Sequence, residues 1–335
     1  MQVPYAYVKD LIEKAIAMFI FKEYNSTRRL FLLLLPAAII FLAASPLVSN
    51  KSTATRSIAG KSKKWKSLFN GKDFSGWDSH LNKPLSSIHI PGLEKDSTGE
   101  YTKRLGLNND PLHVFSVVKE DGAAAIRVSG QIFGYIVSKE SFSDFHLRLQ
   151  FKWGLQKWAP RLNEKRDAGL LYYSVGQPEQ HPGTWMTSQE CQIQEGDCGD
   201  FWPIGNTRID IPSGKSEDFY QYHPDSLLTT FGNGTVAGPR CAKHPDNEKP
   251  NGEWNTVEVI SFNGNSVHLI NGKITMRLFN SRLLVNGTEE PLKAGRIQLQ
   301  SEGAEIFYRN IEVVALSKIP PVLKDFKLKK QEPVN

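Results

Sequence analysis

Acidic and amide side chains occur at every second residue in two short stretches of the chain, residues 190–194 and 297–302. In a β-strand, successive side chains point to opposite faces. One face would therefore carry Glu190, Gln192 and Gln194, and another would carry Gln298, Gln300 and Glu302. A solvated face usually mixes Lys, Thr and Ser among its polar positions. Two faces built only from Gln and Glu instead indicate the lining of a polar groove, and we expect a carbohydrate ligand there.

Carboxylates on facing strands could act as the general acid and general base of a glycosidic cleavage. Glu190 and Glu302 are the candidates for this pair. The candidates for binding and orienting sugar hydroxyls are Gln192, Gln194 and Gln300. A plain solvated sheet face is the alternative interpretation of both sets, because side-chain alternation alone does not show what faces the strands.

An acidic loop follows the first stretch. Glu195, Asp197 and Asp200 place carboxylates at positions i, i+2 and i+5. Such a set could ligate a divalent cation such as calcium, although the spacing matches no defined calcium loop. An Asx turn is the alternative, and no other cofactor is expected. Trp202, at the end of the loop, could stack on a sugar ring or cap the core.

Three cysteines allow one disulfide at most. Cys191 falls on the apolar face of its predicted strand and is expected to be buried. Cys198 and Cys241 both lie in Gly/Pro-rich loops, so a bridge between them is the predicted pairing. Zinc is not expected, because neither a Cys-x-x-Cys motif nor a paired-histidine spacing occurs.

Short strands with turn punctuation run from Trp65 to about residue 316 and predict an all-β sandwich or barrel. Residues 145–153 alternate apolar and polar side chains, which is typical of a half-buried antiparallel strand. Asn-Gly turns at 263–264 and 271–272 predict hairpins. His146 and His268 are expected to point outward from their strands. Residues 196–253 show little periodicity and are predicted to form a rim or lid over the polar face.

The chain ends differ from this domain. Arg28 and Arg29 precede a fifteen-residue apolar run, which predicts a secretory signal or an N-terminal anchor helix over residues 1–45. A flexible spacer over 46–64, one domain over 65–316 and an extended tail over 317–335 complete the expected organisation. The protein is therefore expected to be exported, to the periplasm or cell surface, with a membrane tether if the signal is uncleaved.

The net charge of +6 does not indicate nucleic-acid binding. Residues 1–64 contain ten Lys/Arg and three Asp/Glu, so the remaining residues have a net charge of −1. A nucleic-acid binder would carry its basic patch on the folded domain. That class of function is therefore excluded, and a carbohydrate remains the expected partner.

Several blocks of the domain resemble the 3-keto-disaccharide hydrolase-like domain family, in the order in which that family carries them. They are Ser67–Trp77, Asp167–Tyr173, Glu190–Trp202, Gly252–Asn255, Gly295–Gly303 and Tyr308–Ile311. The resemblance implies a concanavalin-like jelly-roll sandwich of two antiparallel sheets, with ligands on the concave face. It also implies action on glycosides whose C3 hydroxyl is already oxidised to a ketone. Many members of the family carry His where this chain has Glu302.

A 3-keto group makes the neighbouring C2 proton acidic, so cleavage can proceed by hydrolysis or by proton removal, elimination and hydration. In either scheme Glu190 or Glu302 would act as the base, and Arg309 would support the enolate or form a salt bridge on the last strand. The alternatives are a non-catalytic lectin-like module that uses the same face, and a tethered scaffold that binds a protein partner.

Overall fold

The computed structural model describes residues 64–178, 184–216 and 218–326. The predicted signal or anchor over residues 1–45, and all but the last residue of the predicted spacer, lie outside these residues. In the part of the chain that the structure describes, no helix has the length and apolar character required to cross a bilayer.

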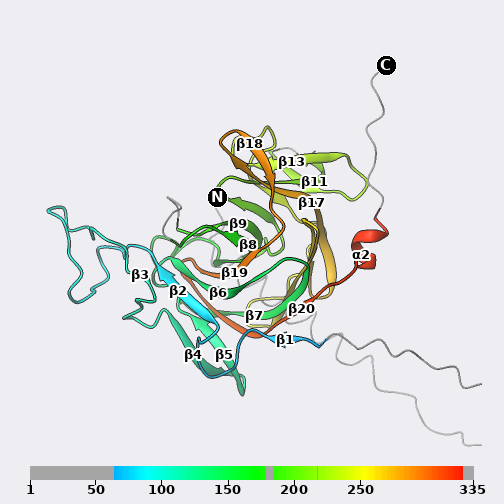
Figure 1. Cartoon of the computed structure of the whole chain (residues 1–335). Helices are drawn as coiled ribbons and strands as arrows, with labels where there is room; N and C mark the ends of the chain where they lie inside the picture. Colours follow the sequence, from blue (N-terminus) through cyan, green and yellow to red (C-terminus); the bar gives the residue numbers. More distant parts are fainter. Residues whose placement is uncertain (1–63, 179–183, 217, 327–335) are drawn as a thin grey trace, which may run out of the picture. The chain divides into compact units, whose positions relative to one another are not determined.

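Strands make up nearly all of the regular structure (Figure 1). The first ten are β1 (Lys66–Ser67), β2 (Trp77–Leu81), β3 (Gly106–Leu107), β4 (Phe115–Glu120), β5 (Ala123–Val128), β6 (Gly134–Phe142), β7 (Phe145–Lys157), β8 (Asp167–Val175), β9 (Thr187–Gln194) and β10 (Phe201–Ile204). The next ten are β11 (Thr207–Ser216), β12 (Phe219–Tyr222), β13 (Leu228–Gly232), β14 (Cys241–Ala242), β15 (Asn255–Phe262), β16 (Asn265–Ile270), β17 (Lys273–Val285), β18 (Thr288–Pro291), β19 (Gly295–Ser301) and β20 (Ala304–Ala315). One short helix, α2 (Pro321–Lys324), follows them.

The strands form two main layers. Sheet A runs β4-β5-β20-β7-β15-β16-β17, with β1 also paired to β20. Sheet B runs β3-β2-β6-β19-β8-β9-β10 and continues through β14, β12 and β11. All neighbours in both sheets are antiparallel except β12 and β14. The expected all-β sandwich with almost no helix is confirmed.

One apolar core lies between the two sheets. Sheet A contributes residues such as Leu147 and Val257, and sheet B contributes residues such as Leu170, Cys191 and Leu299. Alternation along each strand then sends the intervening side chains to the outer faces. The outer face of sheet A and the outer face of sheet B are therefore separate polar surfaces, and this separation decides where each candidate residue can act.

The strongest strand signals in the sequence are confirmed. The alternating stretch from residue 145 forms the first part of β7. Asn263-Gly264 and Asn271-Gly272 connect β15, β16 and β17, and all four residues have positive φ, as a type I′ hairpin turn requires. His268, however, does not point outward. It lies opposite Val259 and shares the core side of β16 with Ile270, so His268 is buried and contacts Tyr172.

Two predicted irregular segments are more ordered than expected. Residues 196–253 contain five strands, β10 to β14, and pack around a second apolar core that includes Phe201, Phe231 and Met276. The predicted extended tail contains α2, because Leu323 packs against Ile260 and Val267 on the outer face of sheet A. Residues 327–335 of that tail lie outside the described residues.

Candidate functional site

Three adjacent strands of sheet B, β8, β9 and β19, build the polar face that the sequence predicts. In the register of β8 and β9, Leu171 lies opposite Glu190, Gly169 opposite Gln192, and Asp167 opposite Gln194. Facing residues of an antiparallel pair point to the same side of the sheet. The intervening Cys191 and Ile193 lie in the core between the sheets, so the face that carries Glu190 is the outer face of sheet B.

Residues of β19 complete this face. Gln298 lies opposite Leu171, and Gln300 follows two residues later on the same side. The two glutamines differ in their contacts. The Gln298 amide donates to Ser174 Oγ at 2.7 Å and its carbonyl accepts from the Met186 backbone at 3.2 Å, so Gln298 ties β19 to the chain before β9. Gln300 instead donates its amide to Glu190.

Glu190 and Gln300 meet above a glycine. A Cβ on Gly169 would lie 2.0 Å from Glu190 Oε1 and 2.4 Å from Gln300 Oε1, so only glycine leaves room for both side chains. Glu190 is 3% exposed and Gln300 is 1% exposed. Gln300 Oε1 is buried and has no hydrogen-bond partner among the described residues, which is uncommon and requires an explanation.

A second group of carboxylates surrounds Arg161, in the turn between β7 and β8. Arg161 Nη1 donates to Glu302 Oε1 at 2.7 Å, and its Nη2 contacts Asp167 Oδ2. Gln194 Nε2 donates to the same Asp167 oxygen at 2.6 Å. The other oxygen, Asp167 Oδ1, is buried without a partner among the described residues. One guanidinium thus joins a carboxylate at the start of β8 to one that directly follows β19.

These carboxyl groups share an electrostatic environment. Burial raises the pKa of Glu190 well above its ordinary value, and the charges of Glu302 and Asp167 raise it further. Burial raises the pKa of Asp167 to about 6 in spite of the adjacent Arg161 guanidinium. Burial and the charge of Asp167 likewise raise the pKa of Glu302, while Arg161 opposes the shift. Three neighbouring carboxyl groups beside one arginine oppose one another's ionisation, so each holds its proton to a higher pH than an isolated carboxyl group would.

The remaining predicted residues of this face lie as follows. Trp202 lies opposite Glu190 in the β9–β10 register, so its half-buried side chain is on the same side of sheet B. Gln192 is buried, and its Oε1 accepts from the backbone of Ile193 at 3.1 Å. Gln194 positions Asp167. The structure therefore brings together Glu190, Glu302, Gln192, Gln194, Gln300 and Trp202 on one side of sheet B.

Arg309 does not belong to this group. It lies on β20 of sheet A, where it pairs with Gln150 of β7 and donates from Nε to Gln150 Oε1 at 2.9 Å. Its guanidinium stacks on Trp254, 3.8 Å from the ring centroid. Because the neighbouring Tyr308 is in the core, Arg309 points to the outer face of sheet A. The predicted contact of Arg309 with a substrate enolate in this site is therefore wrong.

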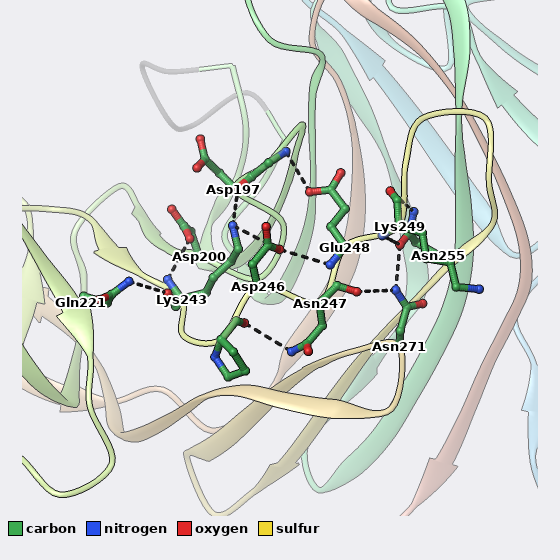
Figure 2. Close-up of polar contacts among 12 residues, drawn as sticks. Asp197, Asp200, Gln221, Lys243, Asp246, Asn247, Glu248, Lys249, Asn255 and Asn271 are labelled. Atoms are coloured by element: carbon green, nitrogen blue, oxygen red, sulfur yellow. Dashed lines mark hydrogen bonds and ion pairs between the residues drawn. The ribbon is translucent and has the colours of Figure 1, made fainter. Parts of the chain in front are cut away.

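The acidic side chains of the loop after β9 are held by ion pairs and hydrogen bonds, and Figure 2 shows the contact of Asp200 with Lys243. Asp197 contacts Lys165 at 2.7 Å, and Asp200 contacts Arg240 at 2.7 Å and the Lys243 backbone amide at 2.9 Å. Glu195 pairs with Arg166 at 2.9 Å. Within the described ranges, no group of three or more His, Cys, Asp or Glu side chains is arranged to hold a metal ion. The described residues of this loop therefore do not form the set of calcium ligands that the sequence suggested.

The predicted Cys198–Cys241 disulfide is absent, since all three cysteines are buried free thiols. The reason is that the two residues belong to different layers of packing. Cys198 packs in the core between the main sheets, whereas Cys241 lies on β14 opposite Phe201 and packs in the second core. The expectation that Cys191 is buried is confirmed.

The sequence interpretation missed Arg161 and Asp167. A usable signal existed for Asp167, because Asp167, Gly169 and Leu171 alternate in a strand that pairs with residues 190–194. No comparable signal existed for Arg161, because it lies in an irregular turn, and only the packing of that turn against Gly303 brings it to Glu302.

Comparison with solved structures gives matches of low structural similarity. A candidate glycosyl hydrolase from Parabacteroides distasonis is 19% identical, covers 76% of this chain and 94% of its own, and has a TM-score of 0.40. A GH16 protein from Bacteroides ovatus in complex with a product is 12% identical, covers 76% of this chain and 99% of its own, and has a TM-score of 0.37. The carbohydrate binding module CBM66 from Bacillus subtilis is 9% identical, covers 60% of this chain and 92% of its own, and has a TM-score of 0.36. TM-scores this low support no argument about substrate.

The family comparison is more informative. No curated protein matches the sequence. The family model of the 3-keto-alpha-glucoside-1,2-lyase-like domain matches residues 64–314, which is almost the whole described part of the chain. This is the family that the ordered sequence blocks predict, and its boundaries agree with the predicted domain to within two residues. Residues 64–314 therefore belong to the 3-keto-alpha-glucoside-1,2-lyase-like domain family.

Proposed function

We propose that this domain is an enzyme that cleaves 3-keto-glycosides, using carboxyl groups on the outer face of sheet B. One observation carries the proposal: Glu190, Asp167 and Glu302 come from three segments of the chain, the first two are buried and the third is half-buried, and the pKa of each is raised, with Arg161 paired to Asp167 and Glu302. Perturbed carboxyl groups gathered in this way are typical of acid–base sites.

The proposed reaction is an elimination followed by hydration. The ketone at C3 acidifies the proton at C2, so a base removes that proton and the electron pair forms the enolate. The enolate then re-forms the ketone as the C1–O bond breaks, and an acid delivers a proton to the departing oxygen. Water adds to C1 of the resulting double bond, and a proton returns to C2. The net reaction consumes one water and releases the 3-keto sugar and an alcohol.

The environments of the carboxyl groups suggest how these roles divide. Glu190 is the acid, because burial and two neighbouring carboxylates raise its pKa well above the ordinary value and favour its protonated form. The Asp167–Glu302 pair supplies the base, because Arg161 stabilises its ionised form and the pKa of Asp167 is about 6. A base with a pKa near the working pH is both available and strong enough. Arg161 also provides positive charge near a developing enolate.

Unpartnered polar atoms support a sugar as the ligand. Gln300 Oε1 and Asp167 Oδ1 are both buried without partners among the described residues. Sugar hydroxyls can donate to both oxygens and remove the cost of leaving them unpaired. Trp202, on the same side as Glu190, offers an aromatic surface of the kind that packs against the C–H face of a pyranose.

Incubation of the protein with 3-keto-trehalose in heavy water tests this proposal. We expect release of 3-ketoglucose that carries deuterium at C2, at a level above the non-enzymatic exchange of 3-ketoglucose itself. Release without deuterium at C2 would indicate direct hydrolysis. Binding without any release would leave a lectin-like module, and would remove the enzyme proposal.

Matched variants test the residues. Glu190→Gln and Glu302→Gln should each abolish release while the far-ultraviolet circular dichroism spectrum is unchanged. Glu290→Gln, at an exposed position of β18, is the control and should retain full activity. Full activity in both site variants would show that these carboxyl groups do not perform the chemistry.

We also propose that the chain is exported through its N-terminal segment, with a tether to the membrane if that segment is not removed. The proposal rests on the apolar run after Arg28 and Arg29. Fractionation of cells that express the full chain tests it. Recovery of the protein only from the cytosol would contradict export.

A further inference from the structure

The outer face of sheet A holds a polar cavity that the proposed reaction does not use. Its volume is about 370 Å³, within the range of small-molecule sites, about 300–1,000 Å³. It is lined by Arg148, Leu149, Gln150, Thr256, Asn310 and Glu312. The catalytic carboxyl groups lie on the outer face of the other sheet, with the main core in between. Helix α2 covers a neighbouring part of the same face, around Ile260, and leaves this cavity open.

Strand register and a bulge create the cavity. Across β15, β7 and β20, one row of facing residues consists of Thr256, Gln150 and Arg309. The neighbouring row consists of Glu258, Arg148 and Glu312. Between the two rows β20 contains a register shift, from Arg309 to Glu312. The bulged strand places Asn310 at a positive φ of 51° and separates the rows, which opens space above Leu149.

The lining offers hydrogen-bonding groups that are fixed in position and still available. Gln150 Oε1 accepts from Arg309 Nε and from Asn310 Nδ2, each at 2.9 Å. These bonds orient both amides and leave Gln150 Nε2 and Asn310 Oδ1 without partners among the described residues. Thr256 Oγ is also available there. A donor, an acceptor and a hydroxyl on rigid strands match the vicinal hydroxyls of a sugar, each of which both donates and accepts.

The charges of the lining favour a neutral ligand. Arg148 donates to Glu312 Oε2 from Nε at 2.9 Å and contacts the same oxygen from Nη2 at 2.8 Å, so this ion pair has no net charge. Two tryptophans flank the rows. Trp65 stacks on Arg148 at 4.1 Å, and Trp254 stacks on Arg309 at 3.8 Å. Aromatic rings beside planar polar groups suit a ligand with both C–H and hydroxyl surfaces.

We propose that this cavity is a second carbohydrate-binding site, which binds a neutral sugar through Gln150 and Asn310 and operates independently of the catalytic face. Such a site would hold the enzyme on a polysaccharide while the face of sheet B acts on smaller molecules.

Affinity electrophoresis in gels that contain amylopectin, dextran or mixed-linkage β-glucan tests the proposal, with polygalacturonate as the charged comparison. We expect at least one neutral polysaccharide to retard the protein. Asn310→Gly should weaken the interaction about fivefold or more, since one polar contact to the ligand is lost. Glycine tolerates the positive φ at this position, so the backbone is preserved. Gln150→Ala is a second variant, with the same expected loss.

Two controls make the result specific. Asn286→Gly changes another asparagine of positive φ, 49°, in the turn between β17 and β18, and should not alter the retardation. Glu190→Gln should also be retarded normally, even if it is inactive, which separates this site from the proposed reaction. Three outcomes would each overturn the proposal. The first is that none of the three neutral polysaccharides retards the protein, and the second is that only polygalacturonate does. The third is that both cavity variants are retarded as strongly as the parent protein.

Discussion

Gly169 lies directly against Glu190, so closely that a Cβ on Gly169 would be 2.0 Å from Glu190 Oε1. The same Cβ would be 2.4 Å from Gln300 Oε1. Both conflicting atoms are ends of side chains, which can rotate away without moving the backbone. The absence of a side chain at this position therefore preserves the contact between Glu190 and Gln300, and has little importance for the path of the strand.

Gly169→Ala should accordingly lower activity more than stability. We expect kcat/KM for a 3-keto-glycoside to fall about a hundredfold, because a displacement of about 1 Å in a reacting group has an effect of this size. The melting temperature should change little. Gly134→Ala is the contrasting variant, since its Cβ would lie 2.2 Å from the His80 backbone carbonyl and the strands themselves would have to separate. If Gly169→Ala instead unfolded the protein at unchanged specific activity, the glycine would serve the fold alone.

Glu190→Gln should stabilise the protein at alkaline pH while it removes activity. The folded-state pKa of Glu190 is raised, so between the ordinary value of 4.5 and the folded value the folded chain retains a proton that the unfolded chain has lost. The stability that Glu190 contributes therefore falls as pH rises through this window. Glutamine does not ionise, so the variant avoids this loss.

Thermal melts across a pH series measure the effect. The melting temperature of Glu190→Gln minus that of the parent should be near zero at pH 4 and should increase with pH, by about 2–4 °C for each 1 kcal/mol gained. Glu290→Gln, on the exposed β18, should show no such trend. A difference that is the same at every pH would mean that ionisation of Glu190 does not oppose folding.

Arg161→Gln should move the acidic limb of the pH–rate profile to higher pH. The Arg161 guanidinium lowers the pKa of Asp167 and of Glu302, so its removal raises both values and leaves less of the ionised base at a given pH. For a base with a pKa of about 6, we expect the loss of kcat/KM to be larger at pH 6 than at pH 9. Arg161→Lys retains the charge and should shift the limb less. An equal loss at all pH values would indicate a purely structural role.

The sequence predicts those parts of this site that depend on strand alternation. The common face of Glu190 and Gln192 follows from the two-residue period, and the core position of Cys191 follows from the same argument. Alternation does not show which face of a strand meets the core: His268 was expected at the surface but lies opposite Val259 on the core side of β16. The bulge beside Asn310 opened a cavity that periodicity does not reveal.

Relations between strands that are distant in sequence could not be predicted. Arg309 and Glu302 are only seven residues apart, yet the chain changes sheets between them, so their side chains lie on opposite sides of the molecule. Conversely, Arg161 reaches Glu302 across 141 residues because a turn folds over the end of β19. Loop composition likewise suggested a disulfide, but the separate packing of Cys198 and Cys241 was visible only in the fold.

The cysteines give a further prediction, which concerns accessibility. Cys191, Cys198 and Cys241 are all buried free thiols, and burial raises the pKa of each thiol well above its ordinary value. The reactive thiolate is therefore scarce and shielded in the folded protein. A thiol reagent such as Ellman's reagent should react slowly with the native domain and should detect three thiols after denaturation without reductant. The melting temperature should be the same with and without reductant. Detection of one thiol, or a melting temperature lowered by reductant, would show that two of the cysteines pair after all.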